Sequence, residues 1–137
     1  MKRTMLIFLV IFIVTVSMVP VQAYPGQETA VNNLSNPSFN WVETTFNFGS
    51  IKLGIPVIHE FSFTNDGDGP LIITSVKATC GCTVTDYSRD PVSPGEQGFV
   101  RATFNAAKPG PFSKTVTVLS NTGEKAIVLT IKGEVVE

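Results

Sequence analysis

Cys80 and Cys82 are the residues of this chain whose types and spacing point most directly to chemistry. They are the only two cysteines among 137 residues, and only Gly81 separates them. Two thiols this close can form a local disulfide, bind a soft metal ion or exchange disulfides with a partner. The motif therefore marks one candidate site without choosing among the three chemistries.

A disulfide between Cys80 and Cys82 would lie at the limit of the allowed geometry in a flat strand. Alternate residues of a strand are ~6.6 Å apart, because each residue rises ~3.3 Å, whereas disulfides prefer Cα separations of ~5.5–6 Å. Gly81 can adopt conformations closed to other residues, and a bend there would bring the sulfurs together. Such a small ring would be strained and readily reduced. It also closes almost no loop, so stabilising the fold is a poor explanation for the bond.

Metal binding, redox catalysis and an inert role are the alternatives for this pair. Two thiolates suit Cu(I), so copper is the cofactor that the metal hypothesis names. His59 is the only other strong candidate ligand, but it shares a strand face with Phe61 and Phe63 and is expected to point inward. A thioredoxin-like redox site would need Cys-x-x-Cys at a helix start, which is absent. The simplest interpretation is that the cysteines pack as small apolar residues or form an inert disulfide.

Other catalytic constellations are missing from the sequence. His59 is the only histidine, so no Ser-His-Asp set can form, and no Gly-rich phosphate loop precedes a helix. Asp86 and Asp90 near Arg89 fit a solvated turn better than an acid–base pair. We therefore expect a protein that is not an enzyme.

Residues 1–23 have the pattern of a secretory signal peptide. Lys2 and Arg3 precede an apolar run from Met5 to Val19, and cleavage is expected between Ala23 and Tyr24. The run is shorter than the ~20 residues of a membrane-spanning helix. We therefore expect an exported protein of the periplasm or cell surface, with no membrane span in its mature form.

The remaining chain divides into a tether and one domain. Residues 24–40 are rich in Asn, Ser, Pro and Gly, which indicates a flexible tether. Residues 41–137 have the length of one domain with one core. The 10 basic residues barely differ in number from the 11 acidic ones and are not clustered, so neither nucleic acid nor an anionic membrane is an expected partner.

Short segments of alternating apolar and polar residues, separated by turns, fill the domain. This pattern predicts about seven strands and an immunoglobulin-like antiparallel β-sandwich. A shift of apolar parity near Thr74 and Ser75 predicts a bulge. A short strand is expected from Thr83 to Tyr87. The other strands should direct these residues into the core: Phe46, Phe48, Val57, His59, Phe61, Phe63, Leu71, Ile73, Val76, Ala78, Val100, Ala102, Phe104, Phe112, Val116, Val118, Ile127, Leu129, Ile131 and Val135.

Several motifs resemble one bacterial family. They are Phe46-x-Phe48-Gly49, the stretch from His59 to Ile73, Cys80-Gly81-Cys82-Thr83, Pro94-Gly95, Gly110-Pro111-Phe112-x-Lys114 and Leu129-x-Ile131-x-Gly133. Over residues 42–136 the chain is similar to domain-of-unknown-function family 1573. The resemblance implies an exported protein with an immunoglobulin-like fold, similar to the abnormal-spindle, major-sperm-protein and hydin group. It implies no activity.

The sequence thus favours a non-enzymatic interaction or accessory module of the bacterial cell envelope. An unknown protein partner is expected at the sheet edges or at loops of one end, including residues 79–83 and 90–98. Trp41 is expected to cover one end of the core rather than to bind a sugar. The alternative function is thiol-based, either soft-metal (copper) binding or redox chemistry at Cys80 and Cys82.

Overall fold

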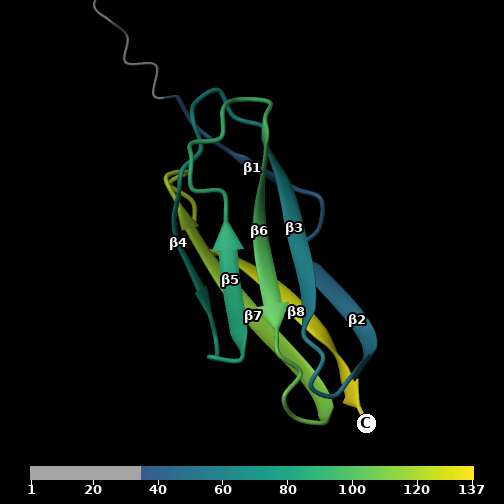
Figure 1. The fold of residues 1–137 in the computed structure, drawn as a ribbon. Helices are drawn as coiled ribbons and strands as arrows, with labels where there is room; N and C mark the ends of the chain where they lie inside the picture. Colours follow the sequence, from purple (N-terminus) through teal and green to yellow (C-terminus); the bar gives the residue numbers. More distant parts are fainter. Residues whose placement is uncertain (1–34) are drawn as a thin grey trace, which may run out of the picture. The chain divides into compact units, whose positions relative to one another are not determined.

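The computed structural model describes residues 35–137, which form two β-sheets packed face to face (Figure 1). The expected signal peptide, its cleavage point between Ala23 and Tyr24, and the tether up to residue 34 lie outside the described residues. Within the described part of the chain, no helix has the length and apolar character needed to cross a membrane.

Eight strands build the two sheets. Sheet A has the order β1-β3-β6-β5 and sheet B the order β2-β8-β7-β4. The strands are β1 (Phe39–Trp41), β2 (Thr45–Lys52), β3 (Val57–Asn65), β4 (Ile73–Ala78), β5 (Thr83–Tyr87), β6 (Gln97–Phe104), β7 (Gly110–Ser120) and β8 (Ile127–Val136). The expected sandwich is confirmed. The N-terminal segment of residues 39–52 forms a split first strand, in two parts that belong to different sheets. Its first part, β1, pairs with β3 in sheet A, and its second part, β2, pairs in parallel with β8 in sheet B.

The core lies between the sheets and consists largely of the expected inner-face residues. Fully buried side chains include Phe61 and Phe63 of β3 and Leu129 and Ile131 of β8. Phe46, Phe48, Val57, Val76, Ala78, Phe112 and Ile127 are partly buried and pack against them. Three further core residues, Ile51, Val92 and Ala106, were not expected from the alternation.

The expected irregularity in the third predicted strand is present. The register between β4 and β7 shifts between Ile73 and Ser75, as the change of apolar parity predicts. The bulge lets Ile73 and Val76 of β4 both contribute to the core although the regular alternation of the strand is interrupted.

The folded domain begins earlier than residue 41. Phe39 and Asn40, expected to belong to the tether, pair with β3 as part of β1. Trp41 packs on Phe39 and Phe63, with ring centroids 5.0 and 4.9 Å away, respectively. Asn36 N also donates to Asp68 Oδ1 at 2.7 Å. The boundary therefore moves toward the N-terminus, because aromatic burial and strand pairing fix residues whose local composition is typical of a tether.

Candidate functional site around the Cys-Gly-Cys turn

Cys80 and Cys82 lie in the turn by which the chain crosses between the sheets. β4 is an edge strand of sheet B and β5 an edge strand of sheet A, and residues 79–82 connect them. Thr79 N donates to Thr115 O at 3.0 Å, and Asn105 N donates to Cys82 O at 3.1 Å. These two bonds attach each end of the turn to a neighbouring strand or loop.

The two cysteines are joined by a disulfide. Their Cα atoms are 5.3 Å apart, and no free cysteine remains in the part of the chain that the structure describes. The expected backbone bend needs no left-handed conformation at Gly81, which is not among the glycines of positive φ. Instead Thr83 N donates to Cys80 O at 3.3 Å, which closes a four-residue turn. The turn therefore brings the cysteines closer than a flat strand would.

A cleft of about 400 Å³ adjoins the disulfide. Cys82 lines it together with Phe104, Phe112 and two cationic side chains, Lys108 and Lys114. We call this hollow the Cys82 cleft. Cys80 does not line it, and its Sγ lies 3.9 Å from Thr83 Oγ1, a side chain that is more than nine-tenths buried. The two cysteines thus have different surroundings, a difference that sequence spacing alone does not reveal.

His59 faces the space between the sheets, as expected, but it contacts aromatic rings. Its ring stacks on Phe46 with centroids 3.6 Å apart and meets Phe61 edge-on. Its Nε2 is 3.0 Å from Glu43 Oε1, yet this buried nitrogen has no hydrogen-bond partner among residues 35–137. The structure therefore assigns His59 a packing role beside one carboxylate and does not group it with the cysteines.

The soft-metal hypothesis gains no support from this arrangement. A disulfide offers no thiolate ligands until it is reduced. Among residues 35–137, no group of three or more His, Cys, Asp or Glu side chains converges as metal ligands would.

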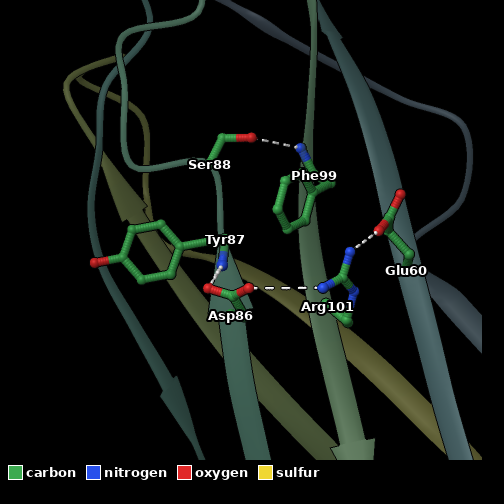
Figure 2. A network of polar contacts seen from close by, with 6 residues as sticks. All are labelled: Glu60, Asp86, Tyr87, Ser88, Phe99 and Arg101. Atoms are coloured by element: carbon green, nitrogen blue, oxygen red, sulfur yellow. Dashed lines mark hydrogen bonds and ion pairs between the residues drawn. The ribbon is translucent and has the colours of Figure 1, made fainter.

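A polar network that the sequence analysis did not single out crosses the outer face of sheet A (Figure 2). Arg101 on β6 lies between Glu60 on β3 and Asp86 on β5, with contacts of 2.7 and 3.6 Å. Asp86 is thus one partner in an ion-pair row, not half of an acid–base pair. The alternation of apolar and polar residues along the strands could have indicated this network, because Glu60, Asp86 and Arg101 occupy outward positions that pair in register.

An apolar row lies beside this network. Ile58 on β3 and Val84 on β5 flank Thr103 on β6, and their side chains are 60% and 67% exposed. At the C-terminal end of β5, a second hollow is lined by Asp86, Asp90 and Glu96 with Arg89 as its only basic residue. The outer face next to β5 therefore changes from apolar to acidic along the strand.

The two loops expected to share one end of the sandwich lie at opposite ends. Residues 79–82 precede β5, whereas the loop from residue 88 to residue 96 follows it (Figure 1). The extended strand β5 lies between the two loops, so they are separated by the length of that strand. They cannot form one loop cluster, and the edge strand between them is the feature that they share.

Comparisons with solved structures show the same fold in proteins of low sequence identity. A protein of unknown function from Porphyromonas gingivalis W83 is 17% identical, with a TM-score of 0.66 over 77% of this chain and 50% of that chain. The ASH/PapD-like domain 7 of human CEP192 is 10% identical, with a TM-score of 0.61 over 72% of this chain and 85% of that domain. The secreted serine protease VesC from Vibrio cholerae is 13% identical, with a TM-score of 0.55 over 74% of this chain and 23% of that chain.

These likenesses concern the fold alone, and the chain spans only half of the Porphyromonas protein and about a quarter of the protease. No curated protein matches the sequence. The sequence itself matches a family over residues 39–135, which begins at the first residue of β1 and includes the disulfide turn. The chain therefore belongs to the family described as "Protein of unknown function (DUF1573)".

Proposed function

We propose that this chain is a non-enzymatic interaction module of the bacterial cell envelope that receives an extended segment of another protein along β5. The observation that carries the proposal is the character of this edge. β5 pairs with β6 in regular register and contains neither Lys nor Pro. Natural edge strands are usually protected by such residues or by bulges, so an unprotected edge favours strand addition.

The other three edges are protected or short. β2 and β4 both have register shifts, and both contain a lysine. β1 has only three residues. These features discourage pairing with a further strand at every edge except β5.

The backbone of Thr85 is directed away from sheet A. Asn105 N donates to Cys82 O and Ser88 N donates to Phe99 O, which fixes the alternation of bonded pairs between β5 and β6. In an antiparallel ladder the bonded positions alternate, so Val84 and Asp86 bond to β6, whereas Thr85 presents its N–H and C=O outward. Outside the strand ladders, Thr85 forms no backbone hydrogen bond among residues 35–137, and β6 is the only strand paired with β5.

The side chains beside β5 suggest the chemistry of the partner. Val84 offers an exposed apolar contact, and the hollow beyond Tyr87 is lined by Asp86, Asp90 and Glu96. A partner segment with an apolar residue opposite Val84 and a basic residue near the acidic end would complement both. The disulfide and the expected signal peptide support an oxidising, exported location.

The test uses a photoreactive amino acid at Val84 in the protein expressed in its own cells. Cross-linked partners are identified by mass spectrometry in three backgrounds: wild type, Thr85→Pro and Thr85→Val. Proline removes the outward N–H but leaves the bonds of Val84 and Asp86 to β6 in place, whereas valine retains the N–H. We expect one partner to be captured by the wild type and Thr85→Val and lost in Thr85→Pro. Equal capture by the proline variant would rule out strand addition at β5.

A second candidate function is thiol–disulfide chemistry at Cys80 and Cys82. The observation that favours it is the disulfide itself, because a bond between residues two apart lies beside an accessible cleft with two lysines. Alkylation of the protein directly in the envelope, before reduction, measures the fraction of free thiols. A measurable reduced fraction supports exchange in the cell, and complete oxidation under all growth conditions argues for an inert bond.

A further inference from the structure

The surroundings of Cys80 and Cys82 differ, and this difference bears on which of them an incoming thiolate would attack. Cys82 lines a cleft that a ligand can enter, together with Lys108 and Lys114. Cys80 lies outside this lining, and its Sγ is near the hydroxyl of the buried Thr83. Attack on a disulfide depends on which sulfur the incoming thiolate can reach and on how well the leaving thiolate is stabilised.

We propose that the cysteine thiolate of an acidic segment of a partner protein attacks Cys82 Sγ in the Cys82 cleft and displaces Cys80. This inference rests on the second candidate function and names its substrate class. The two lysines attract an anion, and an incoming thiolate is one. Carboxylates next to the partner's cysteine extend the same attraction, so the cleft selects acidic segments over basic ones.

The steps balance without any further reagent. The partner thiolate forms a bond to Cys82 Sγ, the Sγ–Sγ bond breaks, and its electron pair leaves on Cys80 as a thiolate. The Thr83 hydroxyl, now 3.9 Å from that sulfur, can donate a hydrogen bond to it. The product is a mixed disulfide between Cys82 and the partner.

The fate of the mixed disulfide depends on the partner. A partner with a second thiol attacks its own sulfur in the mixed disulfide, becomes oxidised by two electrons and leaves Cys80 and Cys82 reduced. With a single thiol, either the adduct persists or the Cys80 thiolate reverses the reaction and releases the partner.

The surroundings of the turn are suited to exchange without loss of the fold. Cys82 O accepts from Asn105 N, and Thr79 N donates to Thr115 O, through backbone groups that do not involve the sulfurs. Opening the disulfide therefore leaves the backbone attachments of β4 and β5 in place. The reduced protein is expected to remain folded and to be able to act again after reoxidation.

The test compares two reduced peptides of equal length with one cysteine each, flanked by glutamates in one and by lysines in the other. Each is mixed with the oxidised mature protein, quenched by acid and alkylation, and analysed by mass spectrometry. We expect the acidic peptide to form the mixed disulfide about tenfold faster at low ionic strength. The preference should disappear in concentrated salt. Tandem mass spectrometry should place the peptide on Cys82 and the alkyl group on Cys80.

Matched variants assign the preference to the cleft. Lys108→Gln with Lys114→Gln should abolish it, whereas Lys125→Gln, an exposed lysine outside the cleft lining, should retain it. An adduct on Cys80, or equal rates for both peptides with the wild type, would overturn the inference while leaving the thiol function intact. Failure of both peptides to react would contradict the thiol function itself.

Discussion

At the scale of single residues, Asn65 stands out because it is polar and completely buried. Its Nδ2 donates to Gly69 O at 2.7 Å and to Val92 O at 2.8 Å. Its Oδ1 accepts from Gly67 N and Ser38 N. One side chain at the end of β3 thus satisfies backbone groups in three separate segments. This role of Asn65 could not be predicted from the sequence, since local composition does not show which distant carbonyls face a side chain.

Asn65→Ala is expected to lower the free energy of unfolding by about 3 kcal/mol, because buried backbone groups lose their only side-chain partner. Chemical denaturation followed by circular dichroism measures the change. Asn40→Ala is the matched control, since Asn40 is exposed on β1 and its side chain forms no hydrogen bond within residues 35–137. This variant should change stability by less than about 0.5 kcal/mol. Similar small losses for both variants would show that the Asn65 bonds contribute little.

At the scale of elements, the parallel pairing of β2 with β8 depends on a close approach at Gly133. A Cβ atom at this position would lie 2.7 Å from Gly49 O and 3.0 Å from Phe112 Cε1. The register between the strands also shifts nearby, between Asn47 and Ser50. Glycine at position 133 therefore lets the split first strand reach sheet B.

Gly133→Ala is expected to destabilise the protein by about 1–3 kcal/mol, because the backbone of β2 must move to make room. Gly81→Ala is the control, since a Cβ there meets no atom within 4 Å and Gly81 does not have positive φ. The control should unfold like the wild type and retain its disulfide, as intact mass can show. Loss of the Cys80–Cys82 bond in Gly81→Ala would mean that the turn requires glycine after all.

The disulfide turn is expected to contribute little to global stability. The bond joins residues two apart, so in the chain-entropy view it removes only about 1.6 kcal/mol of freedom from the unfolded chain. The variant with both Cys80→Ser and Cys82→Ser should therefore lose at most about 2 kcal/mol in guanidinium denaturation. Reduced wild type is the reference that separates loss of the bond from the effect of the substitutions. A loss above about 4 kcal/mol would identify a structural disulfide and weaken the case for exchange.

At the scale of the whole molecule, the sandwich could be predicted because strand alternation is a local signal. Phe61 and Phe63, or Leu129 and Ile131, identify their inner face by spacing alone. The division of the first strand could not be predicted, since it depends on β1 pairing with β3 and β2 pairing with β8. The same limit applies to the candidate site. The cysteines are evident in the sequence, whereas Lys108 and Lys114 reach the cleft only through the fold.

Trp41 provides a probe of whether β1 and the rest of the sandwich form one cooperative unit. It is the only tryptophan, and it packs on Phe63 in the core while its strand pairs with β3. If β1 is an integral part of the domain, tryptophan fluorescence and far-ultraviolet circular dichroism should change at the same denaturant concentration. A tether-like segment would instead release Trp41 at a lower concentration.

Phe39→Ala sharpens this comparison. Phe39 stacks on Trp41 and meets Phe63 edge-on, so its removal weakens the attachment of β1 without altering the fluorophore. In a cooperative domain the loss of this aromatic contact, about 3 kcal/mol for a Phe→Ala change, should lower both transitions together. If only the fluorescence transition moves, β1 unfolds separately, and the domain boundary belongs after Trp41 rather than before Phe39. Coincident transitions in both proteins would establish that the sandwich folds with its first strand divided between the two sheets.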